Sequence, residues 1–278
     1  MKRLRLFSFF IQLSVIVGVI GIVLFLFSVN ANAEDTTGLI SWWKLDEGTG
    51  TNIGDSCGSN DGTIVDDGDV PTFEPGVSGT ALHFHGGDGV DAGWGRVPQD
   101  DSMEVHTGDY TIEMWMKRDS TYGSAIIQYG GGYGPSDPGY KLAYNKNAKN
   151  CSGAMGSWDA PPDHTGHGSF WNNHIGDQDI EVDTWYHLAL VFDRDDKIKL
   201  YVNGVQSGVG FDISLYSAED VATKPADFYF GGHDWHGDMD GMIDELRIWD
   251  VALTQEQIEW FYNHPGKIPV RGTLIRVF

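Results

Sequence analysis

The chain has 278 residues and a formal net charge of −22, because 40 acidic side chains outnumber 18 basic ones. Such a surface repels nucleic acid and anionic lipid, so neither is expected as a partner, and it suits an extracellular medium that contains divalent cations. The 14 Phe, 11 Tyr and 10 Trp residues indicate a packed core and argue against a disordered acidic chain.

The N-terminal segment has the pattern of a secretory leader. Three basic residues among the first five precede an apolar run over residues 6–27, and the small-residue sequence Ala31-Asn32-Ala33 follows. This order predicts a signal peptide over residues 1–33 and a secreted or extracytoplasmic protein. The apolar run is also long enough to cross a bilayer, so an uncleaved N-terminal membrane anchor is the alternative. No later segment is apolar enough to span a membrane.

Short apolar stretches separated by Gly, Asp and Asn follow from residue 38 onward. Residues 197–202 alternate between apolar and polar, and Asn203-Gly204 then supplies the positive φ of a tight hairpin turn. This alternation predicts a sheet with one wet face. The predicted strands are residues 39–45, 81–84, 110–116, 125–129, 140–144, 184–192, 197–202, 227–231 and 242–249. Residues 150–181 have no regular pattern and are expected to form a long connection.

One short helix is expected near the C-terminus. Thr254 and Gln257 form a capping-box pattern, Ile258 and Phe261 supply an apolar stripe, and Pro265-Gly266 ends the helix. Together with the strands, this predicts an all-β fold, a two-sheet antiparallel β-sandwich or jelly roll with one C-terminal helix. The domain is expected over residues 34–264, with a C-terminal tail over 265–278.

Six segments, taken in order, resemble the laminin-G-like, or concanavalin A-like, jelly-roll family in its pentraxin-related branch. They are residues 40–48 (ISWWKLDEG), 58–63 (GSNDGT), 79–84 (GTALHF), 110–115 (YTIEMW), 185–204 with its YVNG turn, and 241–258 with its IDELRIW strand. The resemblance implies two curved antiparallel sheets with adjacent first and last strands. It also implies a binding module, and many members hold calcium. An insertion over about residues 145–183 departs from the family pattern.

A calcium site is the first candidate, because the ion prefers six to eight oxygen ligands and aspartates gather on two Gly-rich loops. The later loop precedes the closing strand, where pentraxins place calcium ligands, and the earlier loop makes a second contribution there. The predicted ligands are Asp137, Asp234, Asp238 and Asp240. Solvated turn aspartates without metal are an open alternative. A rival set near the paired terminal strands is Asp46, Asp88 and Asp244.

Aromatic side chains in the irregular segments are candidates for a sugar platform, because indole rings stack on the flat faces of sugars. The candidate ligand contacts are Trp158, Trp171, Trp235 and His236. Anchoring of the loops is the alternative role for the three Trp residues. The histidines at 164, 167, 174, 233 and 236 match no tight zinc motif and are expected to be surface polar residues.

The two cysteines, Cys57 and Cys151, predict a disulfide, because an exported chain with an even cysteine count invites one. Two unpaired thiols far apart in space are the alternative.

The leading functional hypothesis is a secreted, non-catalytic recognition module that binds carbohydrate or glycoprotein with calcium. A polysaccharide-degrading enzyme of the same fold is the first alternative, since related hydrolases use paired carboxylates on one strand. The acids of residues 177–183 lack the spacing of those enzymes and precede a strand where the family has a surface turn. A protein–protein adhesion domain is the second alternative.

Overall fold

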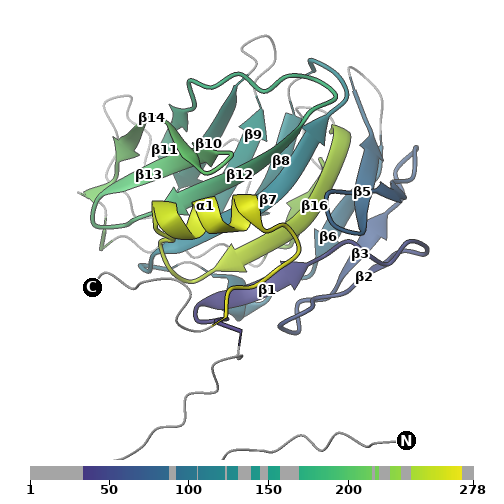
Figure 1. Ribbon diagram of the computed structural model, residues 1–278, viewed down its shortest axis with the longest axis horizontal. Helices are drawn as coiled ribbons and strands as arrows, with labels where there is room; N and C mark the ends of the chain where they lie inside the picture. The colour runs from purple at the N-terminus through teal and green to yellow at the C-terminus, as the bar shows by residue number, and fades with distance from the viewer. Residues whose placement is uncertain are drawn as a thin grey trace, which may run out of the picture.

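The computed structural model describes residues 34–87, 92–104, 106–122, 124–130, 139–144, 150–156, 169–214, 217–218, 226–232 and 239–270. Two antiparallel sheets of eight strands each pack face to face (Figure 1). The predicted all-β sandwich with one C-terminal α-helix is therefore confirmed over these residues. Among them, no helix is both long enough and apolar enough to cross a membrane.

The first sheet has the order β14-β13-β12-β7-β16-β5-β4, with β1 also paired to β16. Its strands are β1 (Leu39–Trp43), β4 (Thr72–Pro75), β5 (Thr80–His85), β7 (Tyr110–Arg118), β12 (Trp185–Phe192), β13 (Lys197–Val202), β14 (Val205–Asp212) and β16 (Asp240–Trp249). The second sheet has the order β11-β10-β9-β8-β15-β6-β3-β2. Its strands are β2 (Asn52–Ile53), β3 (Gly62–Val65), β6 (Trp94–Val97), β8 (Ser124–Gly130), β9 (Gly139–Tyr144), β10 (Cys151–Gly156), β11 (Ser169–Ile175) and β15 (Phe228–Phe230). A short 3-10 helix, η1, covers Asp101–Met103.

The first and last strands lie side by side, as the family resemblance implied. Strand β1 pairs antiparallel with β16, with Trp42 opposite Arg247 and Trp43 opposite Leu246. The predicted tight turn at Asn203-Gly204 is also present: the two residues have φ values of 52° and 81°, as a type I′ turn requires. The turn joins β13 to β14, a strand that the sequence did not predict.

The core between the sheets is centred on aromatic rings contributed by both layers. Trp43 of β1 is fully buried, and its ring stacks on Phe228 and Phe230 of β15 at centroid distances of 5.4 and 6.4 Å. Its indole nitrogen donates to the backbone oxygen of Asn60 at 2.7 Å. Because β1 belongs to the first sheet and β15 to the second, this one side chain holds the two layers together.

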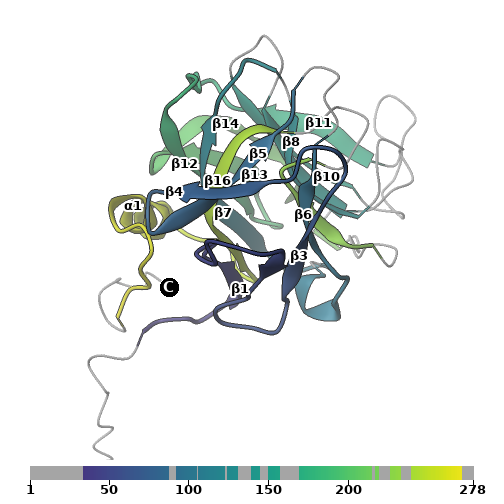
Figure 2. The ribbon, with the colours of Figure 1, turned by 90° about the vertical axis from the view of Figure 1, so that its right-hand side faces the viewer.

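Helix α1 (Gln255–Asn263) covers the outer face of the first sheet (Figures 1 and 2). The predicted capping box is present, with reciprocal bonds between Thr254 and Gln257. Ile258 and Phe261 pack with Trp42, Tyr201 and Trp249 in a second apolar cluster. The expected wet face is therefore wrong at Tyr201, whose ring is only 5% exposed, because the helix covers that part of the sheet.

The stretch over residues 150–181 was expected to be a long connection, and that expectation is wrong, because it contains β10 and β11. Strand β10 reads CSGAMG and lacks apolar alternation. A Cβ atom on Gly153 would lie 2.3 Å from the side chain of Leu190, so the small residue lets β10 pack closely on the opposite sheet.

Replacement of Trp43 by alanine should lower the free energy of unfolding by about 3–5 kcal/mol, because it leaves a large cavity between the sheets. Chemical denaturation followed by circular dichroism measures this loss. Val209→Ala is the control, since Val209 is 82% exposed and its truncation should change stability by less than about 0.5 kcal/mol. A loss below about 1 kcal/mol for Trp43→Ala would contradict the central role of this ring.

Candidate functional site

The outer faces of the two sheets differ in what covers them. Helix α1 and the residues that follow it lie on the first sheet, and their apolar side chains bury its outer face. In the described part of the chain no helix lies across the outer face of the second sheet (Figure 2). The second sheet is therefore the candidate ligand-binding face.

A line of polar side chains crosses this outer face in register. Thr63 pairs with Arg96, Arg96 with Tyr229, Tyr229 with Gln128, and Gln128 with Lys141. Their neighbours along the strands belong to the core, so alternation directs these five side chains outward. We call them the polar row. It crosses five strands, which corresponds to roughly 20 Å at the usual spacing of strands in a sheet.

The polar row combines an aromatic ring with hydrogen-bonding groups. Arg96 is 48% exposed along its side chain and forms an ion pair with Asp227, whose other oxygen accepts the backbone N–H of Gln99 at 3.0 Å. The Tyr229 hydroxyl donates to the same Asp227 carboxylate at 3.5 Å. The bond and charge of Asp227 raise the pKa of Arg96. Such a surface offers a ring for stacking and both donors and acceptors for hydroxyl groups.

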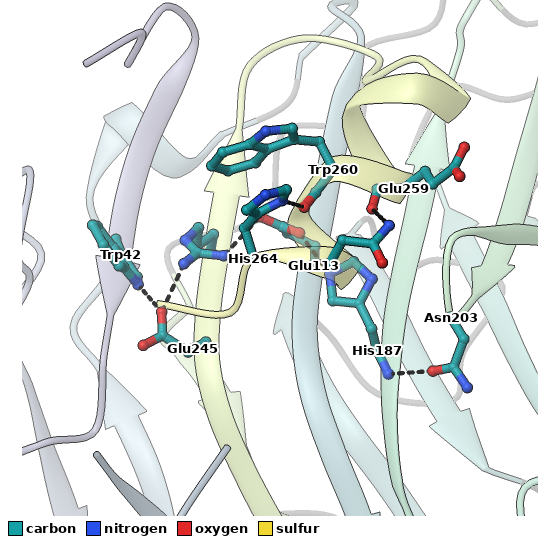
Figure 3. Close-up of polar contacts among 10 residues, drawn as sticks. Trp42, Glu113, His187, Asn203, Glu245, Glu259, Trp260 and His264 are labelled. Carbon is teal, nitrogen blue, oxygen red and sulfur yellow. Dashed lines mark hydrogen bonds and ion pairs between the residues drawn. The ribbon is translucent and has the colours of Figure 1, made fainter. Parts of the chain in front are cut away.

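A cluster of charged side chains lies on the other sheet, beneath helix α1 (Figure 3). Glu113 of β7 accepts from His187 Nε2 at 2.7 Å and from Arg247 Nη1 at 3.1 Å. Arg247 Nη2 also donates to Glu245 Oε2 at 2.7 Å, and Trp42 Nε1 donates to the same oxygen at 2.6 Å. We call these five residues the ion cluster. They connect strands β1, β7, β12 and β16.

The ion cluster is closed to solvent. Glu113, His187, Glu245 and Arg247 are each at most 1% exposed. Burial alone would raise the pKa of Glu113. Arg247 and His187 lower this pKa by more than burial raises it, so it ends below its ordinary value and the carboxylate stays charged. No substrate can reach these groups, and their role is to hold the strands beneath the helix.

Most of the predicted site residues lie outside the described part of the chain. They are Asp137, Trp158, Asp234, Trp235, His236 and Asp238, with Asp88 of the rival set and His164, His167 and His233. Trp171 and His174 fall in β11, but their side chains are not among those described. Asp240 opens β16, where it pairs with His85 and its carbonyl accepts the backbone N–H of Asp119 at 2.9 Å.

The described flanks of the two loops that are predicted to bind calcium lie at different ends of the second sheet. Gly130 and Gly139 bound the earlier loop, at the end where β15 begins with Phe228. The later loop follows Phe230, which lies beside Ile127 nearer the start of β8. Within the described residues, no group of three or more His, Cys, Asp or Glu side chains could hold a metal ion. The calcium set stays a prediction.

The rival set has two members in the described chain, Asp46 and Asp244. Both accept backbone hydrogen bonds where β4 turns into β5. Asp46 Oδ1 accepts the backbone N–H of Thr80 at 2.8 Å, and Asp244 Oδ2 accepts those of Val77 and Ser78 at 2.7 and 3.0 Å. Sequence reasoning did not assign Glu245 to this set. Strict alternation would place it on the opposite face from Asp244, and only a bulge brings both to one side.

The predicted disulfide is wrong, because both cysteines are free thiols. Cys151 is buried in the core between the sheets, whereas Cys57 is exposed in a turn whose backbone is held by Asp55. Burial raises the pKa of Cys151 to about 12. Partial burial and the Asp55 carboxylate raise the pKa of Cys57 to about 12 as well.

The acids of residues 177–183 lie in the connection between β11 and β12, in agreement with a surface turn. Asp177 is exposed and accepts from the Ser207 hydroxyl at 3.0 Å, while Ile180 is buried and anchors the segment. These acids do not lie on one strand, so they do not form the paired carboxylates of a sandwich-fold hydrolase.

Arg247→Met should lower the free energy of unfolding by about 3–5 kcal/mol, because it leaves Glu113 and Glu245 buried without their cation. The loss is expected at neutral pH and should shrink as the pH falls toward the lowered pKa of wild-type Glu113, because the unpaired carboxylate of the variant takes up a proton first and loses its charge. Lys199→Met is the control, because Lys199 pairs with Asp193 and Asp196 near the surface and should cost less than about 1 kcal/mol. Equal losses in the two variants at pH 7 would contradict the cluster's role.

Intact-mass analysis without reductant should show two free thiols. Iodoacetamide at pH 8 should label both cysteines in denaturant but Cys151 only very slowly in the folded protein, because a buried, protonated thiol is a poor nucleophile. Cys57→Ser controls for assignment of the label. A mass about 2 Da lower than that of the dithiol, with no labelling in denaturant, would show that a disulfide forms after all.

Known proteins share this fold. A family model described as the concanavalin A-like lectin/glucanases superfamily (Laminin_G_3) matches residues 88–259, more than half of the chain. A search of curated protein sequences finds no match.

Several solved structures superpose on the chain, all below 25% identity, and so they show the fold alone. Domain 4 of AbnA, an extracellular GH43 arabinanase from Geobacillus stearothermophilus, in complex with arabinotriose, has a TM-score of 0.55 and 23% identity, with 83% of this chain and 99% of that domain covered. A Trypanosoma rangeli sialidase has a TM-score of 0.57 and 18% identity, with 83% of this chain and 33% of the sialidase covered.

The binding domain of botulinum neurotoxin DC in complex with SialylT has a TM-score of 0.58 and 12% identity, with 81% of this chain and 51% of that chain covered. The match to the family model over residues 88–259, together with the sandwich and its paired terminal strands, shows that the chain belongs to the concanavalin A-like lectin/glucanase superfamily.

Proposed function

We propose that this protein is a recognition module that binds carbohydrate on the outer face of its second sheet. The observation that carries the proposal is the polar row, which sets Tyr229 between Arg96 and Gln128 on a face that α1 does not cover. The ring provides a stacking surface, the Arg96 guanidinium can donate to hydroxyls, and the Asp227 carboxylate beside it can accept from them. Superfamily membership supports a carbohydrate ligand over other small molecules.

Two solved structures of the same fold are complexes with sugars or glycan analogues, namely the arabinanase domain with arabinotriose and the neurotoxin domain with SialylT. Their identity to this chain is low, so they support carbohydrate as the ligand class and do not identify a particular sugar. The proposal includes export through residues 1–33, which the leader pattern supports. Kinship with the pentraxin-related branch stays a prediction.

The proposal extends to the predicted residues of the loop after β15. The loop with Trp235 and His236 follows β15, the strand that contributes Tyr229 to the polar row. A ring at Trp235 would extend the stacking surface beyond the sheet, and calcium held by Asp234, Asp238 and Asp240 would order this loop. These roles are part of the proposal.

Tyr229→Ala should weaken binding to the best oligosaccharide on a glycan array by about tenfold or more, equivalent to ~1.4 kcal/mol. Titration calorimetry with that oligosaccharide measures the change. Tyr262→Ala is the matched control, because Tyr262 stacks on Trp115 at the covered face and should leave affinity unchanged. Trp235→Ala tests the loop separately.

Unaltered affinity in Tyr229→Ala, Arg96→Ala and Lys141→Ala alike would remove the polar row as the site. Release of reducing ends or unsaturated sugars would favour the enzyme instead. Binding to a protein without any glycan would favour an adhesion domain.

A further inference from the structure

Arg118 lies at the end of β7, and its side chain points into the space between the two sheets. Met114 and Met116 precede it with the same facing and belong to the core, so strand alternation directs Arg118 inward. The residue is only 1% exposed. Because an arginine side chain does not lose its proton in proteins, this end of the core contains a permanent positive charge.

The guanidinium of Arg118 lacks the hydrogen bonds that its burial demands. Within the described chain, its Nε, Nη1 and Nη2 atoms all lack a hydrogen-bond partner. Two other buried arginines differ from it. Arg247 bonds to the carboxylates of Glu113 and Glu245, and Arg194 donates to a backbone carbonyl at 3.1 Å. A buried cation without a partner is costly, so native proteins seldom keep one unless something balances its charge.

A second unsatisfied donor lies beside the guanidinium. Tyr144 ends β9 in the second sheet, and its ring centroid lies 5.9 Å from Arg118 Cζ. This cation–π contact stabilises the charge in part but leaves the N–H groups free. The Tyr144 hydroxyl is buried and has no partner in hydrogen-bond geometry among the described residues. The Asp240 backbone lowers the pKa of Tyr144, but burial raises this pKa by more, so the hydroxyl keeps its proton and can donate it.

The surroundings favour a small anion as the missing partner. Cys151 pairs with Tyr144 at the start of β10 and is only 1% exposed, and Arg118 acts electrostatically on its thiol. Met239 is fully buried, and a Cβ on Gly241 would lie 3.1 Å from Met239 Cε and 2.9 Å from Arg118 Cα. The donors therefore converge in a closed space, where a monatomic ion fits better than a sugar acid or a phosphate. Water would satisfy the donors but would leave the charge unbalanced.

We propose that Arg118 and Tyr144 bind a chloride ion between the sheets. The ion would accept hydrogen bonds from the guanidinium and the hydroxyl, and its charge would balance the positive charge of Arg118. It would join the end of β7 in the first sheet to the end of β9 in the second, so it would stabilise the sandwich from within. The site lies between the sheets and not on the outer face that carries the polar row, so the inference does not rest on the proposed function.

The test compares the Tm of the purified protein in sodium chloride and in sodium methanesulfonate at equal ionic strength, so that screening is the same. Saturating chloride should raise the Tm by about 3 °C or more, because an ion that binds only the folded state stabilises it. Arg118→Met should abolish this shift, and Tyr144→Phe should reduce it. Lys199→Met is the control, because it removes a cation near the surface and should keep the full shift.

Two further measurements locate the ion. In methanesulfonate, Arg118→Met should be at least as stable as the wild type, because an apolar side chain replaces an unbalanced buried cation. Crystals of the wild type grown in sodium bromide should show an anomalous scattering peak beside the Arg118 guanidinium, because bromide can take the place of chloride.

Three results would overturn the proposal. Equal Tm values of the wild type in the two salts, with Arg118→Met less stable than the wild type in both, would mean that a carboxylate of the chain pairs with Arg118 instead. A chloride shift that persists in Arg118→Met would place the ion elsewhere on the protein. A bromide peak at Arg118 without any difference in Tm between the salts would mean an adventitious ion only.

Discussion

The pairing of β1 with β16 is the constraint on which the rest of the structure depends. It places two adjacent tryptophans on opposite faces of one strand. Trp43 points inward and stacks on the rings of β15, whereas Trp42 points outward and donates to Glu245. The contact between chain ends thus fixes the separation of the sheets and the geometry of the buried charges at once. Because these ends are about 200 residues apart in sequence, their pairing closes a long loop, and such non-local contacts slow folding.

The two outer faces have different roles as a result. The face beneath α1 is closed by apolar packing and by the ion cluster, and its charges are engaged in holding strands together. The outer face of the second sheet keeps exposed or half-buried polar groups at Thr63, Arg96, Tyr229 and Lys141, whereas Gln128 is only 5% exposed. The second sheet is held rigid by its packing on the first sheet, so it can present such groups without rearrangement. This rigidity reduces the entropic cost of binding a flexible glycan.

The sequence predicted the fold wherever local pattern and tertiary packing agree. Strands such as β12 and β13, and the capping box of α1, are evident from periodicity and cap residues. The sequence did not predict β10, because this strand lacks an alternating apolar pattern. Its Gly153 instead allows close packing against Leu190. The sequence also failed for Tyr201, because coverage by a helix some 50 residues later is not visible in a strand's own pattern.

The candidate sites were less predictable for a related reason. The polar row is assembled by register between strands distant in sequence, so Arg96, Tyr229 and Gln128 share no local motif. The common facing of Asp244 and Glu245 depends on one extra residue in β16, which reverses the facing expected for Glu245. The sequence did point to Asp46 and Asp244 as neighbours, because adjacent first and last strands were implied by the family resemblance.

Hydrogen exchange with and without the best-binding oligosaccharide tests most directly whether recognition belongs to the second sheet. Added ligand should slow exchange in β6, β8, β9 and β15 and leave α1, β13 and the β4–β5 turn unchanged. Protection confined to α1 or to the β4–β5 turn, with no change in β15, would contradict the account.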